Sequence, residues 1–314
     1  MKEVASAALP AHTTSPTPSG NRGWALIQAL RPKQWAKNIL VAAAPLAAGE
    51  LSASGIANRV VLMFVALCCA SSAGYLINDV RDRDYDRAHP RKCMRPIASG
   101  QVSTIAAVSW AAGLVVVSIV TASICGRSVA LLTVLYLAVT FAYSLWLKTV
   151  PGLEMVMVSA GFLLRAVIGG VGTSTMLSGW FLIVICAAAL LVVAGKRVAE
   201  MQRLQSVPLD SAAAPRTVLT AYSARYLNLI SMMAATIAVA AYSGWVIFVG
   251  MHRGSGVLTA ASAAPVAAGI ARYVHVINSG GGERPEDALL DDWMMIGLGA
   301  LWLALFSTYV ASAN

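Results

Sequence analysis

The sequence predicts an all-α protein that crosses a membrane several times. Of its 314 residues, 58% are hydrophobic and only 12% are charged, and the mean hydropathy is +0.70. Soluble domains carry about 25% charged residues. The apolar runs are close to the roughly 20 residues that a transmembrane helix needs, and they lack the short alternation of β-barrel strands. The composition therefore excludes a soluble enzyme, a disulfide-stabilised scaffold and a β-barrel.

Apolar runs bounded by charge, glycine or proline predict nine transmembrane helices. They cover residues 34–52, 58–78, 102–124, 128–147, 152–172, 178–196, 222–248, 256–277 and 290–311. The gaps between them are short and charged, so we expect a single transmembrane domain over residues 26–314. Residues 1–25 are rich in Ala, Ser, Thr and Pro and lack the apolar core of a signal peptide, which predicts a disordered cytosolic tail.

The net charge of +9 would suggest a nucleic-acid partner on a soluble protein, but on this chain it indicates orientation. Positively charged loops stay in the cytoplasm. With the N-terminus inside, only Arg59, Arg127 and Arg253 fall outside, and nearly all other basic residues and acids fall inside. We therefore expect a multi-pass protein of the cell membrane, in contact with the bilayer and not with nucleic acid, whose chemistry lies on the cytoplasmic side.

The five cysteines show no spacing typical of a metal site or a disulfide framework. They contain no CxxC pair and have no neighbouring histidine pair. We expect them to serve as packing residues.

Four aspartates gather at the inner end of the second predicted helix, within the segment 78–86. At about 100° per residue, Asp79, Asp82 and Asp86 fall within about 60° of one another, so a continued helix places them on one face. Asp84 points elsewhere. Three carboxylates so close repel one another unless a cation lies among them, and hard oxygen ligands combined with phosphate suit Mg²⁺.

The segment has two other interpretations. An EF-hand fails, because Arg87 stands where that loop needs glycine and Cys93 stands where it needs glutamate. A solvated loop of mixed charge remains open, since the neighbouring arginines could simply pair with the acids.

Basic residues flank the aspartates on both sides in sequence. Arg91, Lys92 and Arg95 follow them, and Lys33 and Lys37 stand at the mouth of the first helix. Such residues are the natural partners of phosphate, although alone they equally fit anchoring on the cytosolic side. Beside a carboxylate cluster they predict a site for a metal ion and a diphosphate.

Further charged residues lie in or near the fifth and sixth predicted helices. Glu154 and Arg165 share a helical face, and a charged Arg inside a membrane helix is expected to line a polar cavity. A structural pairing of Arg165 with a backbone carbonyl stays open. Lys196, Arg197 and Glu200 repeat the pattern at the end of the sixth helix, where snorkelling anchors are an equal alternative. Tyr143 and Lys148 end the fourth helix.

Several of these segments together resemble the UbiA-type intramembrane prenyltransferase superfamily. The resemblance rests on Asn78-Asp79-x-x-Asp82-x-x-x-Asp86, and extends through the stretches 31–38, 89–100, 161–165, 178–181 and 195–200. It implies a bundle of helices around a cavity that faces the cytosol. It also implies that Asp79, Asp82 and Asp86 bind Mg²⁺ and, with Lys148, act in catalysis. The implied substrate-binding residues are Lys33, Lys37, Asn78, Arg91, Lys92, Arg95, Tyr143, Glu154, Arg165, Lys196, Arg197 and Glu200.

One departure from the wider superfamily bears on the substrate. Ordinary members carry a second DxxxD-type motif between the sixth and seventh helices, where this chain has residues 196–203 with a single acid, Glu200. The resemblance then implies transfer of 5-phosphoribose from 5-phospho-α-D-ribose 1-diphosphate (PRPP) to decaprenyl phosphate, for cell-wall arabinan precursors. Prenyl transfer from a polyprenyl diphosphate to an aromatic acceptor is the alternative, and a transporter is a remote one. A homo-oligomer is compatible with the sequence.

Overall fold

The structure is a computed structural model that describes residues 22–90, 92–206, 219–253, 256–280 and 291–313. These residues form helices and connecting turns, with no strand among them. The elements are α1 (Arg22–Leu30), η1 (Pro32–Ala42), α2 (Ala43–Ala47), α3 (Ile56–Arg81), α4 (Arg83–Ala88), η2 (Lys92–Met94), α5 (Thr104–Ile124), α6 (Arg127–Leu145), η3 (Leu147–Thr149), α7 (Leu153–Thr173), α8 (Gly179–Ser206), η5 (Leu219–Ala221), α9 (Ala224–Arg253), α10 (Gly256–Asn278) and α12 (Trp293–Ala313), where η denotes a 3₁₀ helix.

Eight helices of the described chain are long and apolar enough to cross a membrane, namely α3, α5, α6, α7, α8, α9, α10 and α12. They correspond to eight of the nine predicted spans, so the prediction of an all-α, multi-pass membrane protein is confirmed. The largest difference in length is at α8, which continues to Ser206 instead of ending near residue 196. That extension places Arg197 and Glu200 on the helix itself.

The first predicted span, residues 34–52, is not a continuous α-helix in the structure, so the count of nine is not confirmed. Pro32 opens the 11-residue 3₁₀ helix η1, and the five-residue helix α2 follows it. Runs of 3₁₀ helix this long are uncommon. Close packing accompanies this one, because a Cβ added to Gly169 of α7 would lie 1.9 Å from the carbonyl oxygen of Val41. Hydropathy does not reveal such a contact.

The first helix begins earlier than the predicted end of the tail. Helix α1 begins at Arg22, inside the predicted tail of residues 1–25, while residues 1–21 lie outside the described chain. Helix α1 packs on α3 through the buried side chains of Ala25 and Ala29.

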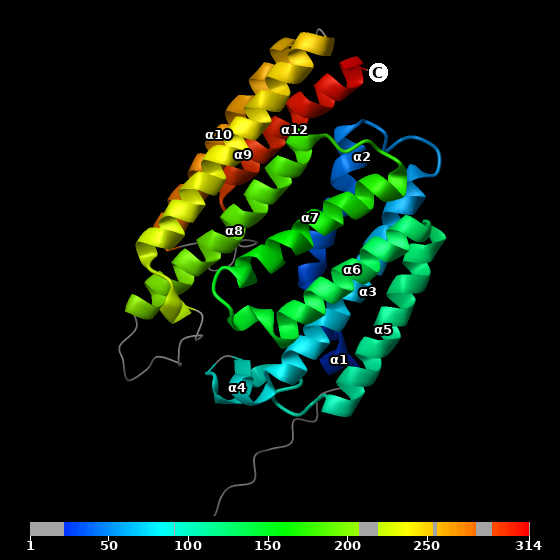
Figure 1. Cartoon of the computed structure of the whole chain (residues 1–314), viewed down its shortest axis with the longest axis vertical. Coiled ribbons are helices and arrows are strands. Elements are labelled where there is room, and N and C mark those ends of the chain that lie inside the picture. Colours follow the sequence, from blue (N-terminus) through cyan, green and yellow to red (C-terminus); the bar gives the residue numbers. More distant parts are fainter. Residues whose placement is uncertain (1–21, 91, 207–218, 254–255, 281–290, 314) are drawn as a thin grey trace, which may run out of the picture.

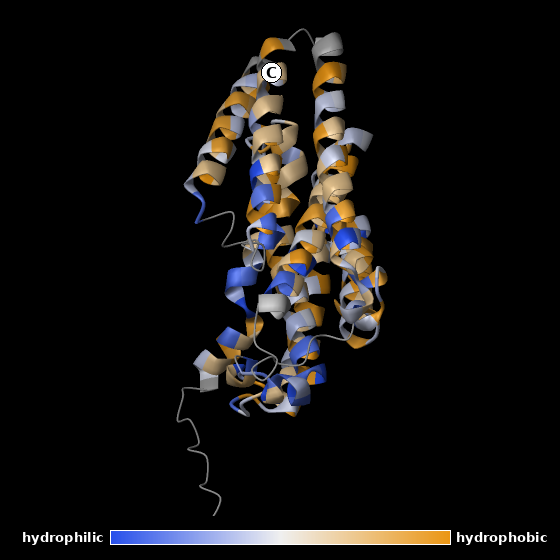
Figure 2. Ribbon diagram, turned by 90° about the vertical axis from the view of Figure 1, so that its left-hand side faces the viewer, coloured by the Kyte–Doolittle hydropathy of each residue, from blue (hydrophilic) through white to orange (hydrophobic). Residues whose placement is uncertain are grey.

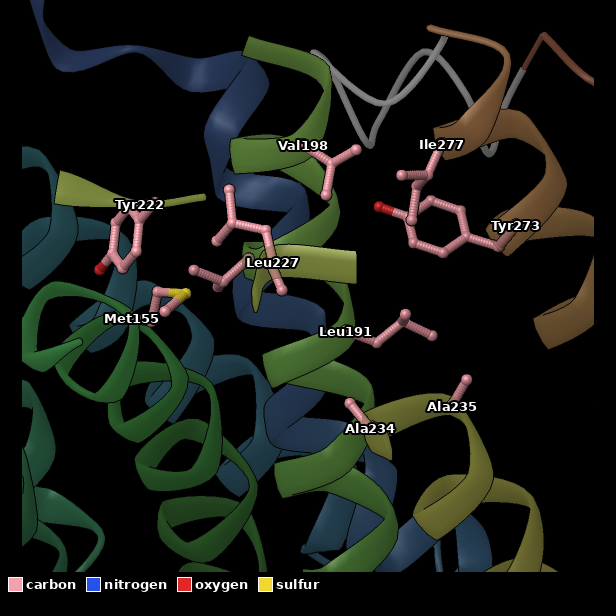
Figure 3. Packing of buried hydrophobic residues seen from close by; sticks show 11 residues of the cluster. Met155, Leu191, Val198, Tyr222, Leu227, Ala234, Ala235, Tyr273 and Ile277 are labelled. Carbon is pink, nitrogen blue, oxygen red and sulfur yellow. The ribbon is translucent and has the colours of Figure 1, made fainter. Parts of the chain in front are cut away.

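The long helices form two groups (Figure 1). Helix α3 packs against α1, η1, α5, α6 and α7, whereas α8 packs against α7, α9 and α10, and α12 packs on α10. Each group has its own buried core. Met63, Leu67 and Ile168 belong to the first, and Met155, Leu227 and Ile277 belong to the second, which Figure 3 shows from close by. Helix α7 contributes to both cores and therefore joins the two groups.

One end of the molecule carries most of the charged residues singled out in the sequence. Figure 1 shows α4 beyond the end of α3, at the same end as the start of α7 and the end of α8. Figure 2 shows hydrophilic ribbon gathered toward this lower end and hydrophobic ribbon prevailing along the upper helices. The fold thus brings residues from distant parts of the sequence to a common polar end.

Candidate functional site

The first cluster joins two buried aspartates through arginine. The side chains of Asp79 and Asp86 are only 3% and 2% exposed. One nitrogen of Arg95, Nη1, lies 2.6 Å from Asp86 Oδ2 and 3.3 Å from Asp79 Oδ1. Arg31 Nη2 donates to the same Asp79 oxygen at 2.5 Å. Buried carboxylates require such partners, because an unpaired charge away from water is costly.

The third predicted aspartate, Asp82, pairs with a lysine from the segment between α6 and α7. Lys148, in η3 after α6, forms a short ion pair with Asp82 and donates to Asn78 Oδ1 at 3.2 Å. The side chains of Lys148 and Asp82 are 18% and 27% exposed. Asn78, Asp82 and Lys148 were all predicted as site residues, and the structure brings them together across 70 positions of sequence.

The sequence predicts one continuous helix through the aspartate segment, but the structure has a break there. Helix α3 ends at Arg81, and Asp82 (φ −92°, ψ 4°) separates it from α4. Helical spacing survives the break, because Asp82 N–H donates to Asn78 O and Asp86 N–H donates to Asp82 O, at 2.9 and 2.8 Å. The backbone therefore keeps the helical spacing from which Asp79, Asp82 and Asp86 were predicted to share one face. Asp84 points away with a side chain that is 94% exposed.

The second cluster pairs α7 with α8. Arg197 donates to both oxygens of Glu154, from Nε at 2.8 Å and from Nη2 at 2.7 Å, and it also forms a short ion pair with Glu200. Glu154 is fully buried, and Arg197 is 3% exposed. Tyr143 of α6 lies within electrostatic range of Arg197. This geometry places Glu154, Arg197 and Glu200 in one bidentate network.

Arg165 lies in a separate buried network. Its Nε donates to Asn38 Oδ1 at 2.8 Å, its Nη1 to Gly161 O at 2.7 Å and its Nη2 to the Tyr136 hydroxyl at 2.7 Å. It is 7% exposed, and no described contact joins it to Glu154 or to the aspartates. The structure thus gives Arg165 the carbonyl pairing left open above, linking η1, α6 and α7. Its predicted contact with phosphate stays a prediction.

The remaining predicted residues that the structure describes lie in η1, η2 and α8. Lys33 is exposed, Lys37 donates to Gln34 at 2.5 Å and Lys92 lies 5.3 Å from the centre of the Tyr85 ring. Lys196 is half-buried on α8. Arg91 lies outside the described residues.

His89 follows α4 beside this cluster. Burial, helped by the nearby positive charge of Lys92, lowers the pKa of His89. A lowered pKa keeps the imidazole neutral at physiological pH.

Arg31 is a site residue that the sequence interpretation left out. It joins α1 to η1 in the left-handed conformation (φ 55°, ψ 60°), which costs a non-glycine residue about 1–3 kcal/mol. Its guanidinium meets Asp79 and lies 5.0 Å from the centre of the Tyr75 ring. In the sequence, Arg31 stands directly before Pro32 and begins the stretch 31–38 that carries the family resemblance, but neither feature indicates where its side chain points.

The three aspartates of the α3–α4 segment offer the type of ligand that Mg²⁺ binds. Magnesium prefers oxygen ligands and is usually bound through one or two carboxylates together with water and substrate phosphates. Asp79, Asp82 and Asp86 supply carboxylates on one side of the α3–α4 segment. Among the described residues, no three His, Cys, Asp or Glu lie together in a group that could hold a metal ion, and each of these aspartates pairs with Arg or Lys. A cation held here would therefore complete its ligand shell from phosphate and water.

Comparison with known proteins supports the fold and shows the family. The sequence pattern of the UbiA prenyltransferase family matches residues 39–303. The chain belongs to this family. The predicted superfamily resemblance is therefore confirmed, and the aspartates from which it was predicted lie where α3 meets α4.

Two relatives are similar to the chain in sequence over most of its length, and one solved structure shares its fold. It is 37% identical to decaprenyl-phosphate phosphoribosyltransferase of Mycobacterium tuberculosis, covering 94% of this chain and 97% of that one. It is 38% identical to the enzyme of the same name from Mycolicibacterium smegmatis, over 88% and 90%. A UbiA homologue from Archaeoglobus fulgidus, solved with GPP and Mg²⁺, shares the fold with a TM-score of 0.69, 17% identity and coverage of 91% and 99%.

Proposed function

We propose that this protein transfers the 5-phosphoribosyl group of PRPP to decaprenyl phosphate and releases diphosphate. The observation that carries the proposal is the 37% identity to a decaprenyl-phosphate phosphoribosyltransferase, which extends over 94% of this chain and 97% of the relative. In this reaction the bond between C1 of ribose and the diphosphate oxygen breaks, and a bond from C1 to an oxygen of the lipid phosphate forms. Attack on the opposite face inverts C1.

The charge of the site suits two anionic substrates. The acceptor phosphate is already an anion, so no strong general base is needed. The protein must instead bring two polyanions together. Arg31, Arg95 and Lys148, which pair with the aspartates in this structure, would supply positive charge for this step. Mg²⁺ held by Asp79, Asp82 and Asp86 would neutralise charge on the departing diphosphate. The Archaeoglobus homologue solved with Mg²⁺ supports this choice of metal.

The position of the clusters suits a soluble donor and a lipid acceptor. The aspartates lie at the end of α3, a helix long and apolar enough to cross a membrane. The soluble donor then enters from the cytosol, while the acceptor keeps its tail in the hydrocarbon. A cavity that opens both to the cytosol and sideways into the bilayer satisfies both requirements.

A comparison of donors tests the proposal. Purified protein with Mg²⁺ is incubated with decaprenyl phosphate and PRPP, and separately with a polyprenyl diphosphate and an aromatic acid. We expect a decaprenylphosphoryl-5-phosphoribose product and released diphosphate only in the first reaction. Product from the prenyl donor alone would overturn the proposal in favour of aromatic prenylation.

Thiol labelling tests the cytosolic position of the site. Cys93 lies in η2 beside the aspartate cluster and is half-buried, whereas Cys125 is buried near the opposite end of α5. In a variant that keeps these two cysteines, an impermeant maleimide should label Cys93 in opened membranes but not in intact cells. Cys125 should stay unlabelled in both. Labelling of Cys93 in intact cells would contradict the orientation.

A further inference from the structure

The two clusters are connected by one short stretch of chain. Lys148, which pairs with Asp82, lies in η3 (Leu147–Thr149), and Glu154, which pairs with Arg197, lies in the first turn of α7. Only the turn that ends at Gly152 separates them. A displacement of this turn would therefore move both charged side chains together.

A tyrosine just before α9 forms a hydrogen bond with that turn. The N–H of Gly152 donates a short hydrogen bond to the hydroxyl oxygen of Tyr222. Gly152 precedes α7 with φ 77°, a conformation that favours glycine, and α7 has no capping side chain of its own there. Amides at the start of a helix lack partners within the helix, so an acceptor from elsewhere fixes the turn.

Tyr222 is itself well fixed. It is 9% exposed, and Figure 3 shows its ring beside Met155, with Leu227 of the same buried cluster nearby. Burial, with a smaller contribution from the negative charge of Glu154, raises the pKa of Tyr222. The hydroxyl therefore remains a neutral phenol next to the Glu154 and Arg197 pair.

We propose that Tyr222 is a positioning residue of the transferase, which holds Lys148 on the aspartate cluster and Glu154 on Arg197 through the Gly152 turn. The inference deepens the proposed function and rests on it. The Tyr222 hydroxyl acts through the turn and touches neither substrate. Its removal should reduce turnover and leave substrate affinity nearly unchanged.

Tyr222→Phe removes only the acceptor oxygen, and Tyr226→Phe is a matched control. Tyr226 stacks on Tyr222 with ring centres 6.0 Å apart, but it is 47% exposed. Misplacement of a catalytic group by about 1 Å can lower a rate a hundredfold. We expect Tyr222→Phe to lower kcat roughly ten- to a hundredfold with little change in either KM, and Tyr226→Phe to match wild type.

A double variant separates positioning from general support of the fold. If Tyr222 acts through Lys148, Tyr222→Phe should have little further effect on kcat in a Lys148→Met background. Hydrogen exchange of the peptide over residues 147–155 should also rise in Tyr222→Phe and not in Tyr226→Phe. Wild-type kcat in Tyr222→Phe, fully additive losses in the double variant or unchanged exchange would each overturn the inference.

Failure of the proposed function would be seen elsewhere in the same experiment. It would show as wild-type protein that does not use PRPP. The ratio of variant to wild-type kcat, measured with whichever donor the wild type accepts, reports on Tyr222 alone.

Discussion

Asp82→Asn is expected to abolish nearly all transferase activity, whereas Asp84→Asn should retain most of it. The two residues are two positions apart and the substitutions are chemically identical. Asp82 forms a short ion pair with Lys148, and its segment carries Asp79 and Asp86 on the same side. The Asp84 side chain is 94% exposed, and its Oδ1 lies 3.8 Å from Nη1 of Arg87. The two variants are expected to differ because the side chains point in different directions, since both substitutions remove the same charge.

The expected loss at Asp82 exceeds that of one ordinary contact. A hydrogen bond to a charged group contributes about 1.5–3 kcal/mol, or roughly a ten- to hundredfold change. Loss of the proposed Mg²⁺ ligand adds to this, so we expect a decrease of at least about a hundredfold. The measurement is the initial rate of lipid product at matched amounts of folded protein. Equal losses in the two variants would show that the carboxylates share their roles differently.

Sequence alone could predict the membrane helices because a bilayer requires a local property, about 20 apolar residues in a row. The acidic motif was equally local, since Asp79, Asp82 and Asp86 lie within eight positions. Helical periodicity then separated Asp84 from the other three, and the structure agrees. The break at Asp82 did not alter these faces, because the backbone hydrogen bonds span it.

The partners of these residues could not be predicted in the same way. Periodicity places Glu154 and Arg165 on one face of α7, but it does not say which helix stands against that face at each depth. Glu154 meets Arg197 of α8, 43 positions away, and Arg165 meets Asn38 of η1, 127 positions away. Arg31 escaped notice for the same reason. Its role depends on a left-handed turn and on the approach of α1 to α3.

The Glu154–Arg197 pair leads to the second large effect, on stability. Glu154→Gln should lower the free energy of unfolding by about 3 kcal/mol, near the lower end of the cost of breaking a buried ion pair. Glu154 is fully buried and Arg197 is 3% exposed, so water cannot replace the lost charge. Glu200 still faces Arg197, which keeps the loss from being larger. The measurement is thermal unfolding of purified protein in detergent.

Glu200→Gln is the matched control, because Glu200 meets the same arginine with a side chain that is 18% exposed. Partly solvated ion pairs contribute about 1 kcal/mol or less, so its unfolding temperature should fall clearly less than that of Glu154→Gln. If Arg197 instead serves mainly to bind substrate phosphate, loss of Glu154 would free it for the ligand. Glu154→Gln would then unfold at the wild-type temperature while the KM for one substrate changed. That outcome would show that the bidentate pair does not stabilise the packing of α7 on α8. The main role of the second cluster would then be to bind substrate.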